Sequence, residues 1–285
     1  MFDEFKKIYN TLESNGVEKP LDETLKLYDI LSKRVISNLD QTIHNEMSIN
    51  FEWLAKQRKI GKPTEYILGK AAFMGQLFDC SPDTLIPRQE TELLTKISID
   101  LVNNQWPEHD QIMIIDMGTG CGNIAVSIAL NAEKARVIAS DLYDSQIKIA
   151  WKNVQRFKLQ ERISLFCGDL FSPLENKGYE NCIDMVVCNP PYIPTAYVGN
   201  LEPEARDNEP LKAFDGGPYG IDIFRRLIND SVRFLKKSGV LIFEIGAGQK
   251  KLVTRLIQKN GNYDGIEYFD DGEQVRVIKS IFQGL

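Results

Sequence analysis

The glycine-rich segment Gly118-Thr119-Gly120-Cys121-Gly122 is the feature that most constrains the fold. It joins an apolar run, residues 112–115, directly to a second apolar stretch, residues 124–130. Glycines at alternate positions let the backbone turn sharply and approach a ligand closely. The pattern predicts a strand, a tight turn and a helix, the first unit of an open α/β sheet. Such a turn can hold an adenosine cofactor or a dinucleotide, or merely connect a strand to a helix.

Downstream of this turn, strand-like and helix-like segments alternate. Alternation of this kind predicts parallel strands joined by right-handed crossovers. The last two strand-like runs, 265–269 and 274–281, are separated by only four residues, so they form an antiparallel hairpin. The fold expected is α/β, a Rossmann-like, mostly parallel seven-stranded sheet with a C-terminal antiparallel hairpin, as in class I S-adenosylmethionine-dependent methyltransferases. The other expected strands are 136–140, 163–166, 184–188 and 239–245, and the helices are 144–157 and 221–236.

The first 60 residues are predicted to be helical. Five apolar residues recur at three- and four-residue spacing, which places them on one helical face: Leu21, Leu25, Tyr28, Leu31 and Val35. A second helix, 49–59, ends before Gly61-Lys62-Pro63.

A short aromatic stretch around Gly75 predicts a β-hairpin over residues 71–80, before a proline-containing linker and a helix over 91–103. We therefore expect a small N-terminal helical domain (1–70), a hairpin and linker (71–90) and a methyltransferase domain (91–285).

Charge and composition narrow the range of partners. The chain has 34 basic and 40 acidic side chains, a net charge of -6, whereas proteins that bind duplex DNA usually carry a basic field. Nucleic acid is thus an unexpected partner. No apolar run approaches the ~20 residues of a membrane span, and the acidic N-terminus does not resemble a signal peptide, so we expect a cytoplasmic protein with no membrane contact. Five cysteines without a C-x-x-C pair and two distant histidines predict no metal site.

Acidic residues at two further strand ends favour an adenosine cofactor. Asp141 ends the second strand, where a carboxylate can accept both ribose hydroxyls. Asp169 and Leu170 follow the third strand, where the carboxylate can accept from the adenine amino group while the leucine packs on the ring. The helix after the glycines would face the charged methionine end of S-adenosylmethionine. The alternative is an ordinary strand–helix turn with solvated acids.

The tetrapeptide Asn189-Pro190-Pro191-Tyr192 follows the buried strand 184–188, which places it at the ligand-binding edge of the sheet. The Asn189 side-chain carbonyl and the Pro190 backbone carbonyl can accept the two hydrogens of an –NH2 group. The prolines restrict the backbone so that these acceptors are already aimed, and Tyr192 can stack on a flat amide or base. A Pro-Pro turn is also a common way for a chain to leave a sheet.

These acceptors suit methylation of a planar nitrogen, which is a poor nucleophile because its lone pair is delocalised. Two hydrogen bonds to its protons aim the lone pair at the methyl group and stabilise the positive charge that develops. Placing the reacting atoms ~3–3.5 Å apart supplies much of the remaining catalysis. No strong base is required, because the methylated nitrogen becomes acidic and loses its proton afterwards.

From about residue 58 to the end, the sequence resembles the protein-(glutamine-N5) methyltransferases that modify peptide chain release factors. Besides the glycine-rich turn and Asn189-Pro190-Pro191-Tyr192-Ile193-Pro194, the motifs that carry this resemblance are Gly61-Lys62-Pro63, Glu65-Tyr66-Ile67-Leu68-Gly69, Phe73-Met74-Gly75, Leu85-Ile86-Pro87-Arg88-Gln89-Glu90-Thr91-Glu92, Glu209-Pro210, Asp215-Gly216-Gly217, Gly220 and Glu244-Ile245-Gly246.

The resemblance implies a role for each motif. Asn189, Pro190 and Tyr192 would be catalytic, and Asn189 to Tyr192 would hold the glutamine of a Gly-Gly-Gln loop in a class I release factor. The N-terminal helical domain would grip the rest of this partner. The residues implied in cofactor binding are Gly118, Thr119, Gly120, Cys121, Gly122, Asp141, Asp169, Leu170 and Asn189.

Departures from the family pattern leave other acceptors open. Cys121 stands where serine is frequent, Leu170 where an aromatic residue is frequent, and Ala72 where an acidic residue usually precedes the phenylalanine. The first 50 residues match only in helical character. The alternatives are the same chemistry on a metabolite nitrogen or on adenine N6 in nucleic acid, and a non-catalytic binding module that keeps the fold.

Overall fold

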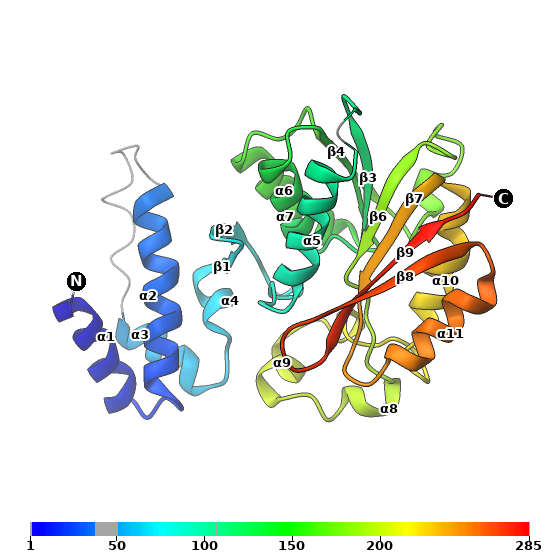
Figure 1. Ribbon diagram of the computed structural model, residues 1–285. Helices are drawn as coiled ribbons and strands as arrows, with labels where there is room; N and C mark the ends of the chain where they lie inside the picture. The colour runs from blue at the N-terminus through cyan, green and yellow to red at the C-terminus, as the bar shows by residue number, and fades with distance from the viewer. Residues whose placement is uncertain (1, 38–50, 107, 285) are drawn as a thin grey trace.

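The computed structural model describes residues 2–37, 51–106 and 108–284. Figure 1 shows a helical N-terminal region, a small hairpin beside it, and a large α/β region whose sheet is covered by helices on both faces. The N-terminal region contains α1 (Phe2–Ser14), α2 (Pro20–Ser37), α3 (Phe51–Lys59) and α4 (Thr64–Leu68).

The five apolar residues predicted to share one helical face lie in α2, which confirms this helix, and the structure shows which of its faces is buried. Leu21 and Leu25 are about half exposed, whereas Leu27 and Ile30 are buried against α1 and α3. The sequence predicted the helix but did not show which of its faces is buried, because both series recur at helical spacing and tertiary packing selects between them. The side chains of Leu31 and Val35, and residues 49–50 of the next predicted helix, lie outside the described residues.

The predicted hairpin is confirmed as β1 (Lys70–Phe73) and β2 (Gln76–Asp79). Met74 and Gly75 both have positive φ, as a tight two-residue hairpin turn requires. The hairpin has two packed faces. Leu77 joins the core of the N-terminal helices, while Phe73 and Phe78 join the core of the α/β region. It therefore bridges the two regions.

The large sheet has seven strands in the order β5-β4-β3-β6-β7-β9-β8. The first five strands in this order are parallel, and β9 and β8 form the antiparallel hairpin that the sequence predicted. The strands are β3 (Ile112–Met117), β4 (Ala135–Asp141), β5 (Ile163–Cys167), β6 (Ile183–Cys188), β7 (Leu235–Glu244), β8 (Tyr263–Asp270) and β9 (Val275–Phe282).

Two apolar cores lie on opposite faces of this sheet. One core packs against α5, α6 and α7, and the other against α10 and α11. The helices are α5 (Thr91–Asn104), α6 (Asn123–Asn131), α7 (Asp144–Arg156), α10 (Asp222–Asp230) and α11 (Lys250–Asn260). None of the helices in the described residues is long and apolar enough to cross a membrane.

The helix expected over residues 221–236 is shorter than predicted. Helix α10 ends at Asp230, and the chain is already in β7 at Leu235, which pairs with Ile183. Ser231 Oγ donates to Leu227 O over 2.6 Å and lies 2.7 Å from the Tyr263 hydroxyl. The Tyr263 side chain, from β8, thus contacts the residue at which the helix ends. The helical periodicity of the sequence gives no indication of a contact between residues so far apart. Helix α11 and two short helices, α8 (Thr195–Val198) and α9 (Pro203–Asn208), were not predicted.

Candidate active site

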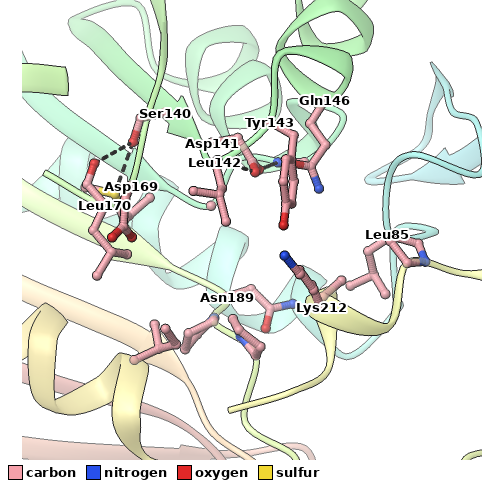
Figure 2. A pocket seen from close by; sticks show the side chains of 18 of the residues that line it. Leu85, Ser140, Asp141, Leu142, Tyr143, Gln146, Asp169, Leu170, Asn189 and Lys212 are labelled. Atoms are coloured by element: carbon pink, nitrogen blue, oxygen red, sulfur yellow. Dashed lines mark hydrogen bonds between the residues drawn. The ribbon is translucent and has the colours of Figure 1, made fainter. Parts of the chain in front are cut away.

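A cavity of about 670 Å³ lies at the carboxyl ends of β3, β4, β5 and β6, where ligands bind in open α/β sheets. Figure 2 shows the side chains of Asp141, Asp169 and Asn189 around it. Of the predicted site residues, the cavity is lined by Gly118, Gly120, Asp141, Asp169, Leu170, Asn189, Pro190 and Pro191, whereas Thr119, Cys121, Gly122 and Tyr192 do not line it.

The three glycines of the turn have different roles. Gly118 and Gly120 have positive φ, and a Cβ built on either meets no atom within 4 Å. Since both line the cavity, a side chain there would take up ligand space. Gly122 instead packs against α7, because its Cβ would lie 3.3 Å from Ala150 Cβ. Two glycines therefore open the cavity, and the third lets two helices approach closely.

A buried carboxylate fixes the shape of this turn. Asp116 at the end of β3 is fully buried and accepts from Thr119 Oγ1 over 2.6 Å and from Ala125 N over 3.1 Å. Burial raises the pKa of Asp116 to about 7 although both hydrogen bonds favour the ionised form. Thr119 is itself buried, so it acts on the cavity by holding the turn.

Asp141 has the geometry expected of a ribose ligand. Its two oxygens each accept one backbone hydrogen bond of 2.7 Å, from Gly120 N and from Leu142 N. A carboxylate offers about four lone-pair sites, so it can still accept two hydroxyl groups. Burial raises the pKa of Asp141, and the backbone hydrogen bonds oppose this shift.

The two residues predicted beside adenine also line the cavity. Asp169 Oδ2 accepts from Arg226 over 2.7 Å, in an ion pair in which both side chains are about half exposed. Leu170 lines the cavity and has a φ of 47°, a backbone conformation that is uncommon for residues other than glycine. The pairing with Arg226 leaves the second oxygen of Asp169 for a donor such as an amino group.

The Asn189 amide is oriented by a side chain from the start of α5. Its Nδ2 donates to Thr91 Oγ1 over 2.8 Å, and Thr91 Oγ1 in turn donates to Glu244 Oε2 over 2.7 Å. With its nitrogen committed to Thr91, Asn189 retains its oxygen for the cavity that it lines. This oxygen can therefore accept a hydrogen bond from a group in the cavity.

Tyr192 faces the same buried carboxylate instead of the cavity. Its hydroxyl donates to Glu244 Oε1 over 3.3 Å. Burial raises the pKa of Glu244 to about 7 and raises the pKa of Tyr192 above its ordinary value. The structure thus places Tyr192 as a support of the loop, while its stacking on an acceptor stays a prediction.

The rest of the Asn189–Tyr192 loop is braced by two segments distant in sequence. Gln249 Nε2 donates to Tyr192 O over 2.8 Å, and Gln249 Oε1 accepts from Gly246 N over 2.9 Å. The backbone around Gly216 packs so closely that a Cβ there would lie 2.8 Å from Pro191 O. These contacts hold the loop rigidly at the end of β6.

The mouth of the cavity is lined by residues to which the sequence analysis assigned no role. Lys212 lies with its Nζ 5.1 Å from the centre of the Tyr143 ring, and Figure 2 shows the two side chains directed toward one another. Leu85, from the linker after the hairpin, lines the same cavity. An exposed lysine and an aromatic residue after a strand have no distinctive pattern, so sequence reasoning could not have selected them.

Glu244 and Thr91 could have been found from sequence. A charged residue that ends the apolar run 240–243 is unusual in a buried strand, where an ionised group is costly unless it is paired. Thr91 lies within a segment already noted for its resemblance. What the sequence lacked was any sign that Thr91 contacts Asn189, 98 positions away, and that Glu244 contacts Thr91.

Comparisons with known proteins decide the family. The chain is 33% identical over 264 residues to a release factor glutamine methyltransferase of Moorella thermoacetica. This alignment covers 91% of this chain and 90% of that protein. It is 30% identical over 281 residues to the Bacillus cereus protein of the same name, with 98% of each chain covered. The chain belongs to the release factor glutamine methyltransferase family. The expected enzyme class, an S-adenosylmethionine-dependent methyltransferase, is confirmed.

Two further comparisons agree with the fold. Residues 111–204 match a family model described as RNA cap guanine-N2 methyltransferase. The hMettl16 catalytic domain, solved with MAT2A 3′UTR hairpin 1, superposes with a TM-score of 0.57 at 14% identity over 86% of this chain and 95% of that one. A ribosomal protein L11 methylase of Lactobacillus delbrueckii subsp. bulgaricus gives 0.50 at 17% identity, over 72% and 84%. At these identities the likeness shows the class I methyltransferase fold alone.

Proposed function

We propose that this protein transfers a methyl group from S-adenosylmethionine to the side-chain amide nitrogen of the glutamine in a Gly-Gly-Gln loop of a class I peptide chain release factor. The names of the relatives support this acceptor. The observation that carries the proposal is the Asn189 amide, whose nitrogen is engaged by Thr91 so that its oxygen remains for an –NH2 group.

The cavity fits the methyl donor. Gly118 and Gly120 leave the space that a Cβ would fill, and Asp141 retains lone pairs for two ribose hydroxyls. Asp169 and Leu170 line the region where an adenine would lie. The bound donor supplies an electrophilic methyl group.

Catalysis by the chain consists of orientation and charge stabilisation. Asn189 Oδ1 and Pro190 O accept the two protons of the glutamine amide, which turns the nitrogen lone pair toward the methyl carbon. The same two dipoles would stabilise the positive charge that develops on nitrogen as the nitrogen–methyl bond forms and the methyl–sulfur bond of the donor breaks, which leaves S-adenosylhomocysteine. They would do so without reorganising during the reaction. The nitrogen then loses one proton to water, because its cationic form is strongly acidic.

The N-terminal region is the part of the chain proposed to bind the release factor. The proposed domains are the N-terminal helical domain (1–70), the hairpin and linker (71–90) and the methyltransferase domain (91–285). Helix α2 exposes Leu21 and Leu25, apolar side chains that a partner can cover. Arg58, almost buried, pairs with Glu23 over 2.9 Å and with Glu204 of the large region over 2.6 Å. This ion-pair cluster supports a fixed placement of the N-terminal region beside the cavity.

The test is methylation of a purified class I release factor. Incubation with the protein and S-adenosylmethionine should increase the mass of the Gly-Gly-Gln peptide by one methylene unit, with the change located on the glutamine. Parallel samples contain adenine-bearing nucleic acid and a mixed metabolite pool. A cofactor-bound preparation that leaves the release factor unchanged but methylates one of these acceptors contradicts the proposal.

The cell compartment in which this protein is proposed to act is the cytoplasm.

A further inference from the structure

The hydrogen bonds behind Asn189 have a fixed direction. Thr91 Oγ1 has one hydrogen, and an ionised Glu244 can only accept, so that hydrogen points to Glu244 Oε2. Thr91 can then only accept from Asn189, which forces the amide nitrogen toward Thr91. The orientation of the acceptor oxygen at the cavity is therefore set by a carboxylate two hydrogen bonds away.

We propose that Thr91 and Glu244 are positioning residues that lock the Asn189 amide with its oxygen toward the methyl acceptor, and that protonation of Glu244 releases this lock. The inference rests on the proposed function and adds the residues that regulate its acceptor site. Both side chains are almost fully buried, with 2% of Thr91 and 1% of Glu244 exposed. When one of these residues is replaced, water therefore does not take over the hydrogen bond that its side chain made.

Protonation reverses the direction of the relay. A neutral Glu244 can donate its proton to Thr91 Oγ1, which frees the Thr91 hydroxyl to donate toward Asn189. The Asn189 amide then turns its oxygen to Thr91 and its –NH2 group to the cavity. Two –NH2 groups facing one another cannot form the required hydrogen bond, so turnover is lost in this state.

The surroundings of Glu244 place this transition near neutral pH. Burial, with a smaller contribution from the charge of Glu90 near the start of α5, raises its pKa to about 7. The hydrogen bonds from Thr91 and Tyr192 and the charge of Arg276 of β9 oppose this shift. Tyr192 and Cys188 also face this region, and burial raises the pKa of each above its ordinary value, so both stay neutral. Because the ionised form of Glu244 is the active one, turnover should fall as the pH decreases through about 7.

The decisive comparison uses four variants in one assay. Thr91→Val keeps the shape of the side chain without the hydroxyl and should lower kcat on the order of 10²-fold, while the Kd for S-adenosylmethionine stays within about twofold of wild type. Thr91→Ser restores the hydroxyl and should restore kcat. Glu244→Gln cannot titrate, so its turnover should not change between pH 8 and pH 6, whereas that of the wild type should fall as the pH is lowered over this range. Thr95→Val, a buried threonine one helical turn away, is the matched control.

Two results of this assay overturn the proposal. The first is equal kcat for Thr91→Val and wild type. The second is an acidic decline that persists in Glu244→Gln, which would assign it to Asp116, whose pKa is also raised to about 7, or to the substrate. Wild-type protein that does not methylate a release factor contradicts the proposed function instead.

A second measurement does not depend on the acceptor. The side-chain amide resonances of Asn189, assigned by their loss in Asn189→Ala, should shift through a transition near pH 7 in the cofactor-bound wild type. They should not titrate in Glu244→Gln. An Asn189 amide that is unaffected by pH in the wild type overturns the relay even if no acceptor has been found.

Discussion

The proposed cofactor half and the proposed acceptor half of the cavity are built in different ways. The cofactor half is local: Gly118, Gly120 and Asp141 lie within 24 consecutive positions and shape one another through hydrogen bonds such as Gly120 N to Asp141 Oδ2. The acceptor half is assembled from distant segments, since the loop at Asn189 depends on Thr91 and on residues after β7. Cofactor binding and acceptor orientation should therefore fail separately when each half is altered.

The largest effect is expected for Asn189→Ala. Removing one of two acceptors of developing charge should lower kcat by ~10²–10³-fold. The Kd for S-adenosylmethionine, measured by calorimetry, should change far less, because the glycine turn and Asp141 are untouched. Asn200→Ala, at an exposed asparagine eleven positions away (200 − 189), is the control and should behave as wild type. Near-normal turnover in Asn189→Ala would refute the assigned chemistry.

Asp141→Ala tests the other half. Loss of hydrogen bonds to a charged group costs ~1–3 kcal/mol, which corresponds to a Kd for S-adenosylmethionine weaker by roughly 5–150-fold. At saturating cofactor, kcat should remain close to wild type. Asp144→Ala, at an exposed residue of the first turn of α7, is the control. A variant with normal cofactor affinity and reduced kcat would show that the two halves are not separate.

Gln249→Ala should give a smaller effect, confined to the acceptor half. The clamp on Tyr192 O and Gly246 N is lost, so the loop position becomes less precise. We expect kcat to fall about 10-fold, less than the ~10²-fold that a displacement of 1 Å can cause. Gln258→Ala, on the exposed face of α11, is the matched control. Weakened cofactor binding with unchanged kcat would contradict this assignment.

The smallest effect is expected at the mouth of the cavity, where the halves meet. Lys212→Ala removes a cation near the Tyr143 ring, a contact worth ~0.5–1 kcal/mol at an exposed site. The Kd for S-adenosylmethionine should weaken about 2–5-fold, measured against Lys237→Ala as an exposed control. An effect as large as that of Asp141→Ala would mean that the mouth contributes directly to binding.

The contrast between the halves also explains what the sequence could predict. The parallel sheet, the terminal hairpin and the glycine turn follow from short-range patterns, and each matches the observed fold. Asp141 was placed at its strand end because strand ends are local signals.

Contacts between distant segments were not predictable from those patterns. Thr91 and Glu244 are separated by 153 positions and meet only because α5 packs beside β7. The sequence of α2 did not show which of its faces is buried, because two apolar series recur at helical spacing. The packing against α1 that selects Leu27 leaves no trace in that sequence. The end of α10 depends in the same way on Tyr263.

The most direct test of the central claim is a crystal structure of the protein with S-adenosylhomocysteine and a Gly-Gly-Gln peptide. We predict that the glutamine amide nitrogen lies ~2.7–3.2 Å from both Asn189 Oδ1 and Pro190 O, with its lone pair facing the sulfur. A bound glutamine whose nitrogen contacts neither oxygen, or an Asn189 amide with its nitrogen toward the peptide, would contradict the account.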